Sequence, residues 1–135
     1  MKKYELLEHV GDLKIRAFGE NLKEAFANAA LAMMAYIYGK EILSKKPDHT
    51  DLIELTADDQ EALLVDWLGE LLYLSNTAYR AYVHYEIKEL SEQKLVAVVG
   101  SLAAQAVEEI KAVTHHDLAI SQKEGRWEIT VVYDI

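Results

Sequence analysis

Three oxygen-bearing groups at opposite ends of the sequence form its best candidate for a chemical site. Asp12 follows a short turn near the start, while Asp134 and the terminal carboxylate of Ile135 stand at the end. Clustered carboxylates repel one another unless protonation or a cation compensates their charge. Calcium or magnesium is the natural cation, because hard cations take oxygen ligands. The alternative interpretation is two ordinary aspartates that end strands.

These groups can meet only if the strands that carry them are neighbours. Residues 13–18 alternate apolar and polar side chains, which predicts a half-buried strand, and residues 127–133 predict a strand that closes a terminal hairpin. In an antiparallel pair the start of one strand lies beside the end of the other. Such a pairing would bring Asp12, Asp134 and Ile135 together.

A second candidate site is His115-His116-Asp117, because adjacent imidazoles and a carboxylate resemble the ligands of metallohydrolases. It predicts a small metal-dependent phosphohydrolase. Neighbouring strand residues point to opposite faces, however, so only one histidine could join a given site unless the backbone turns. His9 beside Asp12 could act as a general base or only orient the turn.

Further carboxylates follow one stripe of a predicted helix, at Asp59, Asp66 and Glu70. Two of them four residues apart could form an acid and base pair. The other interpretation is a solvated or partner-facing edge, because no His or Lys completes a site on that stripe.

The elements that must position these residues are predicted by periodicity. Asn21, followed by Glu24, predicts the start of a helix over 22–37 that Gly39 ends, and Asp58 with Glu61 predicts the start of a second helix that extends to about residue 74. Strands are predicted at 4–9, 13–18, 51–56, 82–90, 94–100, 118–122 and 127–133, and residues 103–113 fit either a short helix or an irregular segment. The pattern lacks regular strand–helix–strand alternation. It therefore predicts an α+β fold, a two-layer sandwich with two long helices packed on a mostly antiparallel sheet.

Length and composition narrow the class of protein. The 135 residues are expected to form a single domain, 1–135, and the absence of cysteine excludes disulfides and thiolate chemistry. A net charge of −9 argues against direct, tight nucleic-acid binding and favours a basic protein partner. No signal peptide or membrane span is apparent, so we expect a cytoplasmic protein.

The residues also resemble a known family, the archeases. The matching segments, in family order, are Glu8-His9 with Asp12, then 28–33, 63–72, 111–118 and 131–135. They extend over nearly the whole chain. The departures are Val10-Gly11, where the family usually has Thr-Ala, and His115, where it usually has tyrosine; a Gly-Glu pair often found within 100–109 is also missing.

The resemblance implies an accessory protein of tRNA splicing and not a stand-alone enzyme. Archeases assist the RtcB-type RNA ligase: they promote its guanylylation, permit multiple turnover and can broaden its nucleotide use. The family metal site, carried over to this sequence, comprises Asp12, Asp134 and the carboxylate of Ile135, with calcium as the usual ion. A chaperone-like modulator of nucleic-acid-processing proteins is a further alternative.

Overall fold

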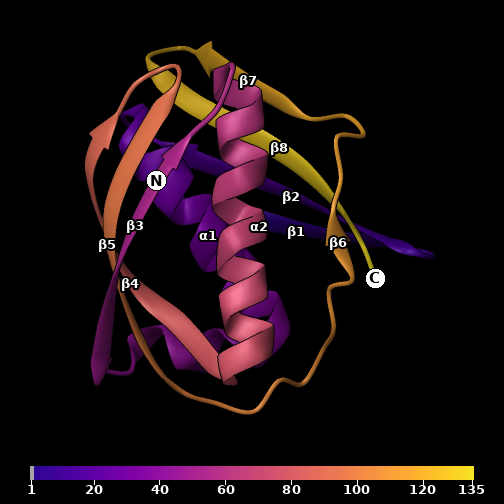
Figure 1. Ribbon diagram of the computed structural model, residues 1–135. Helices are drawn as coiled ribbons and strands as arrows, with labels where there is room; N and C mark the ends of the chain where they lie inside the picture. Colours follow the sequence, from indigo (N-terminus) through magenta and orange to yellow (C-terminus); the bar gives the residue numbers. More distant parts are fainter. Residues whose placement is uncertain (1) are drawn as a thin grey trace.

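Two helices lie against two antiparallel sheets in the computed structural model (Figure 1). It describes residues 2–135, apart from the side chains of Glu8 and His9. The larger sheet contains β1 (Tyr4–His9), β2 (Asp12–Gly19), β8 (Arg126–Asp134) and β6 (Ala112–Val113) in that order, with β7 (Ala119–Lys123) also paired to β8. The smaller sheet contains β3 (His49–Thr56), β5 (Lys94–Ala103) and β4 (Arg80–Leu90) in that order. The helices are α1 (Leu22–Tyr38) and α2 (Gln60–Ala78), with a short 3₁₀ helix, η1, at Lys40–Ser44.

The α+β fold class is confirmed, and the strands prove to be divided between two sheets. Every strand pair is antiparallel. Both helices and both sheets bury their apolar faces in one core, in which Phe26, Trp67 and Tyr133 are among the largest fully buried side chains. Trp67 also ties the helices together, because its indole N–H donates to the Phe26 carbonyl at 3.1 Å. None of the helices in the described residues is long and apolar enough to span a membrane.

Helix α1 begins and ends where the sequence predicts. The Asn21 side chain accepts a hydrogen bond from the Glu24 N–H at 2.8 Å, which satisfies one of the free donors at a helix start. Gly39 ends the helix with φ +90°, a conformation that glycine adopts without the steric cost of a side chain.

Helix α2 begins one residue later than predicted. Asp59, and not Asp58, is the extended residue that caps it, and its carboxylate accepts from the Ala62 N–H at 2.8 Å. A capping side chain must reach the N–H two or three residues ahead, and the first helical residue is Gln60. Asp58 therefore stands one position too early to cap.

Residues 104–111 form no helix. Of the two predictions for this part of the chain, the irregular segment is therefore correct. The segment crosses the end of α1 in an extended path, and the N–H groups of Val107 and Glu108 donate to the Ile37 carbonyl at 2.7 and 3.1 Å. That carbonyl belongs to the last turn of α1, where acceptors lack a partner inside the helix. Of the apolar residues that suggested a helix, Ile110 is buried, while Val107 is 67% exposed.

Candidate metal centre at the end of strands β2 and β8

The pairing of β2 with β8 places Asp12 directly opposite Asp134. The antiparallel register runs from this pair to Gly19 and Trp127 at the other end, which confirms the strand pairing predicted from the sequence. Residues directly opposite in such a ladder present their side chains on the same face, with Cβ atoms about 5 Å apart. Figure 1 shows the start of β2 and the end of β8 near the C-terminus, beside β6. The two aspartates thus share one end of the sheet.

Asp12 carries an oxygen that lacks a partner. Its Oδ1 atom is buried and, among the described residues, which leave out the side chains of Glu8 and His9, has no hydrogen-bond partner. Within the part of the chain that the structure describes, neither Asp12 nor Asp134 forms an ion pair with Lys, Arg or His. A buried acceptor left unpaired costs about 1–3 kcal/mol, and more when it is charged. The position of this oxygen therefore suits a cation or an external donor.

The main chain around Asp134 is held firmly on its other side. Lys111 N–H donates to the Asp134 carbonyl at 2.8 Å, and Ala112 of β6 is the register partner of Asp134. Ile135 is half-buried and packs against the core. These contacts hold the main chain at the end of β8, where the exposed Asp134 lies opposite Asp12.

The aspartates alone do not complete a metal site. Among the described residues there is no group of three or more His, Asp or Glu side chains that could hold an ion. Hard cations also bind carbonyl, water and terminal carboxylate oxygens, and the third ligand predicted at Ile135 would come from the main chain and not from a side chain. The residues fit a calcium ion in their chemistry, and the set Asp12, Asp134 and Ile135 stays a prediction.

Lys14 is a neighbour of this centre that the sequence reasoning did not single out. It lies two residues after Asp12 and therefore on the same face of β2. Its Nζ atom lies 3.7 Å from Asp117 Oδ2, in the loop between β6 and β7. The alternation of Asp12 and Lys14 was visible in the sequence, whereas the contact with Asp117 depends on the path of that loop.

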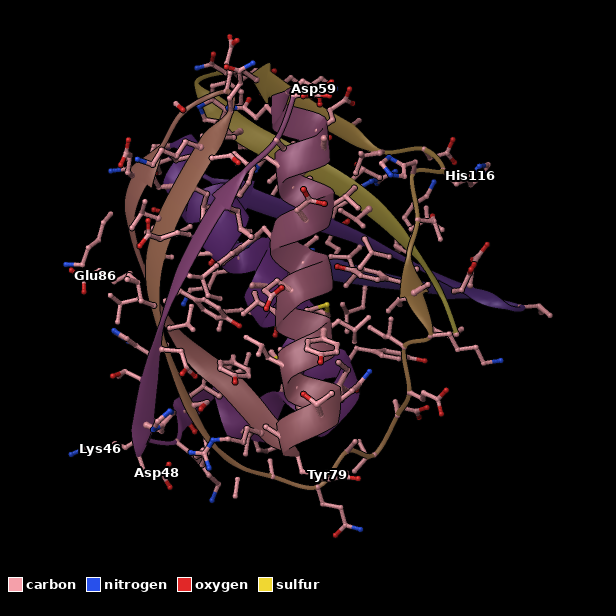
Figure 2. The ribbon with its side chains drawn as sticks, in the orientation of Figure 1. Lys46, Asp48, Asp59, Tyr79, Glu86 and His116 are labelled. Atoms are coloured by element: carbon pink, nitrogen blue, oxygen red, sulfur yellow. The ribbon has the colours of Figure 1, made fainter. Side chains whose placement is uncertain are left out.

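The His115-His116-Asp117 segment does not gather into a metal site. All three residues are exposed, and Figure 2 shows His116 on the outside of the loop. His116 Nε2 lies 3.5 Å from Asp117 Oδ2, but Asp117 has φ +53° and turns the chain. Since no group of three ligating side chains occurs in the described residues, the predicted metallohydrolase site is wrong.

The remaining candidates have different outcomes. The side chain of His9 lies outside the described residues, so its role as a base or as an orienting group stays a prediction; its main chain pairs with Asp12 across the β1–β2 turn. On α2, Asp59 is occupied as the helix cap, while Asp66 is exposed and Glu70 half-exposed. This arrangement agrees with a solvated or partner-facing helix edge.

A model of the archease protein family (MTH1598/TM1083) matches residues 4–135. The chain belongs to the archease family. Protein archease of Methanosarcina mazei is 39% identical over 143 residues, which cover 99% of this chain and 97% of the relative. Protein archease of Pyrococcus furiosus is 32% identical, with both chains covered in full.

Solved structures of similar proteins share the fold. The solution structure of Methanobacterium thermoautotrophicum protein 1598 matches with a TM-score of 0.79 at 29% identity, and the match covers all of both chains. The crystal structure of an archease from Thermotoga maritima, described as a possible chaperone, matches with a TM-score of 0.65 and covers 96% of this chain and 94% of that one. At 19% identity the second likeness concerns the fold alone.

In this archease the turn before Asp12 differs from the usual family sequence without disturbing the strand that follows. Gly11 has φ +85°, which suits the tight turn between β1 and β2, and Val10 beside it is exposed. No hydroxyl group stands at these two positions. Asp12 is nevertheless in register with Asp134, so the absent threonine is not needed to bring the aspartates together.

Proposed function

We propose that this archease is a cytoplasmic activator of an RtcB-type tRNA-splicing RNA ligase and not itself the catalyst. The observation that carries the proposal is the buried Oδ1 of Asp12, which has no hydrogen-bond partner among the described residues; Asp12 itself lies opposite Asp134 at the end of the sheet. A site of this kind is prepared to receive positive charge from a cation or from a partner protein. The ligase as the partner comes from the family resemblance.

In this proposal Asp12, Asp134 and the terminal carboxylate of Ile135 hold a divalent cation, most readily calcium. The ion, when bound, would offset most of the negative charge of the three neighbouring carboxylates and hold their oxygens together at the end of the strands. The protein supplies the positioning: the β2–β8 register holds Asp12, and the Lys111 N–H holds the main chain of Asp134.

The same end of the sheet is proposed to contact the ligase at its nucleotide site and to favour the geometry for its guanylylation. The net charge of −9 supports this, since an acidic protein is steered toward a basic partner surface. Association should accordingly weaken as the salt concentration rises, because exposed charges are screened.

The test is multiple-turnover RNA ligation by a purified RtcB-type ligase, with and without this protein. Asp12→Ala and a variant extended by one residue after Ile135 should each reduce stimulation by about tenfold or more, as expected when a metal ligand or its support is removed. Asp58→Ala is the matched control, because Asp58 is exposed and is not the cap of α2. Full stimulation by both site variants would refute the proposed role of this centre.

A chaperone-like modulator is the second candidate, supported by the description of the Thermotoga maritima archease as a possible chaperone. It predicts that the protein suppresses aggregation of several unrelated unfolded proteins. An activator of a particular ligase should leave such aggregation unchanged and should still increase ligase turnover.

A further inference from the structure

Strand β3 leaves one side of the smaller sheet open. It is the outer strand in the order β3-β5-β4, so no strand of the described residues pairs with its other side. Ala57 N–H donates to the Gln93 carbonyl at 3.0 Å, and Thr56 is the register partner of Lys94. Since hydrogen-bonded pairs alternate along antiparallel strands, Ala57 and every second residue before it bond β5. The main-chain groups of Thr50, Leu52, Glu54 and Thr56 therefore face the open side.

A groove follows this open strand. It has a volume of about 300 Å³ and lies between residues 51–55 of β3 and Glu70 and Leu74 of α2. A second groove of about 460 Å³ shares Leu55 and Glu70 with the first and continues beside α2 to β6. In Figure 2, Asp59 and Tyr79 mark the two ends of α2 and Asp48 marks the start of β3, so the strand and the helix can be followed side by side.

The groove is both apolar and acidic. Leu52 is 61% exposed on the open strand, and Ile53, Leu55 and Leu74 line the groove beside it. Four carboxylates border the two grooves. Within the described residues none of these four pairs with Lys or Arg, and their only ion-pair contact is that of Asp51 Oδ1 with His49 Nε2, at 3.3 Å. The four are Asp51, Glu54, Asp66 and Glu70.

This charge distribution decides which strand the open side suits. A second copy of this chain, paired antiparallel, would bring either Asp51 or Glu54 against an identical carboxylate, depending on the register, and like charges across a strand pair are destabilising. A segment with Lys or Arg at alternate positions would instead place cations beside Asp51 and Glu70 on one face of the sheet and apolar side chains over Leu52 on the other. Charged edges also protect proteins from unwanted pairing, and the same charges select a partner of opposite sign.

We propose that the open side of β3, with the groove beside α2, binds an extended Lys- or Arg-containing segment of another protein by strand addition. This surface belongs to the smaller sheet, whereas Asp12 and Asp134 belong to the larger one. The inference does not rest on the proposed activity toward the ligase, and either can fail without the other.

The probe is a blocked eight-residue peptide in which Lys and Val alternate, titrated into the intact protein and followed by NMR with amide hydrogen exchange. The amides of Leu52 and Glu54 should exchange rapidly in the free protein and about tenfold or more slowly at saturation, because each would gain a hydrogen bond. The amide of Ile53 should change little, since it already bonds β5. The control peptide alternates Glu and Val and should not bind.

Leu52→Pro removes an N–H that faces outward, so it should weaken peptide binding by about tenfold or more while the β3–β5 ladder is kept. Leu52→Ala keeps that N–H and should weaken binding by about threefold through lost apolar contact. Glu54→Lys combined with Glu70→Lys tests the charge without changing the outward N–H groups and should also weaken binding about tenfold. Circular dichroism checks that each variant is folded.

Several results would overturn the proposal. They are no binding of the Lys/Val peptide, equal binding of the Glu/Val peptide, or binding without slower exchange at Leu52 and Glu54. Protection of these amides by self-association, seen as a dimer in sedimentation, would assign the surface to a second copy instead.

Discussion

The molecule has two sets of potential ligands. Asp12 and Asp134 lie on the paired strands β2 and β8, whereas His115, His116 and Asp117 lie in the loop between β6 and β7. The first pair is separated by almost the whole sequence, yet the strand register sets its members opposite each other. The second set is contiguous in sequence, yet it is exposed in a loop and its aspartate contacts Lys14 and His116.

The difference lies in how the fold holds each set of side chains. Two paired strands fix side chains on one face, and one oxygen of Asp12 is buried there without a hydrogen-bond partner among the described residues. A loop in contact with solvent hydrates its polar groups at little cost, so His115 and His116 need no ion. Strand register therefore brings Asp12 and Asp134 together although they are distant in sequence, whereas contiguity leaves His115, His116 and Asp117 spread along an exposed loop.

The largest difference between the two sets should appear when one member of each is removed in turn and ligase stimulation is measured. If the proposed function holds, Asp134→Ala should reduce stimulation of the RtcB-type ligase by about tenfold or more, since a proposed metal ligand is lost. His116→Ala, which changes an exposed loop, should stay within about twofold of the wild type. Multiple-turnover ligation measures both effects. A larger loss for His116→Ala than for Asp134→Ala would mean that the loop, and not the β2–β8 end, is the important set.

Calcium should distinguish the two sets by stability. At about 100 times its Kd, calcium should raise the free energy of unfolding by about 2.7 kcal/mol relative to the protein in chelator. Asp12→Asn should lose this increase, and His116→Ala should keep it. Thermal unfolding with calcium and with EDTA measures the difference, and an equal calcium response of all three proteins would place the ion elsewhere.

Like the Asp12 Oδ1 atom, the hydroxyl group of Tyr133 is buried and has no hydrogen-bond partner among the described residues, but it is uncharged. Tyr133→Phe should raise the free energy of unfolding at neutral pH by about 1 kcal/mol, since an unsatisfied polar group is removed. The calcium response should not change. Denaturant unfolding of both proteins checks the difference, and a loss of stability would mean that the hydroxyl group has a partner.

The same substitution predicts a difference at alkaline pH. Burial raises the pKa of the Tyr133 phenol above its ordinary value of 10.0, so the folded state keeps the proton that the unfolded chain releases. Stability should therefore fall as pH rises past 10, by about 1.4 kcal/mol per pH unit for this group. Tyr133→Phe should fall less steeply over the same range, as measured by denaturant unfolding at successive pH values.

The smallest effect is expected at the contact between the two regions, the ion pair of Lys14 with Asp117. Their side chains are 26% and 56% exposed, so water and salt screen the attraction. A double-mutant cycle with Lys14→Ala and Asp117→Ala should give a coupling energy below about 0.5 kcal/mol. A larger coupling would mean that the loop and the β2–β8 end act as one site.

The sequence predicted the helices and most strands well because their signals are local. Asn21 and Gly39 delimit α1 by hydrogen bonds and dihedral angles of a few consecutive residues. Asp58 and Asp59 are both competent caps, and only the point at which the helix begins decides between them. Residues 104–111 carry apolar positions at helical spacing, but the N–H groups of Val107 and Glu108 bond the carbonyl of Ile37, which is far away in the chain.

The candidate site was predictable in part. The identities of Asp12 and Asp134 followed from the sequence, and their pairing followed from assuming that two predicted strands are neighbours. The ion pair of Lys14 with Asp117 could not be predicted, because it depends on how the loop after β6 turns at Asp117. The open side of β3 was equally hidden, since a strand looks the same in sequence at the edge and in the middle of a sheet.

By itself the sequence determined the local elements, the acidic charge and the residues at which oxygen ligands are available, because these depend on side-chain chemistry and short-range spacing. Only the tertiary structure decided that Asp12 faces Asp134 with one oxygen unpaired, and that the His115 segment stays in solvent. The physical reason is that register, burial and the satisfaction of polar groups depend on contacts between residues distant in the chain.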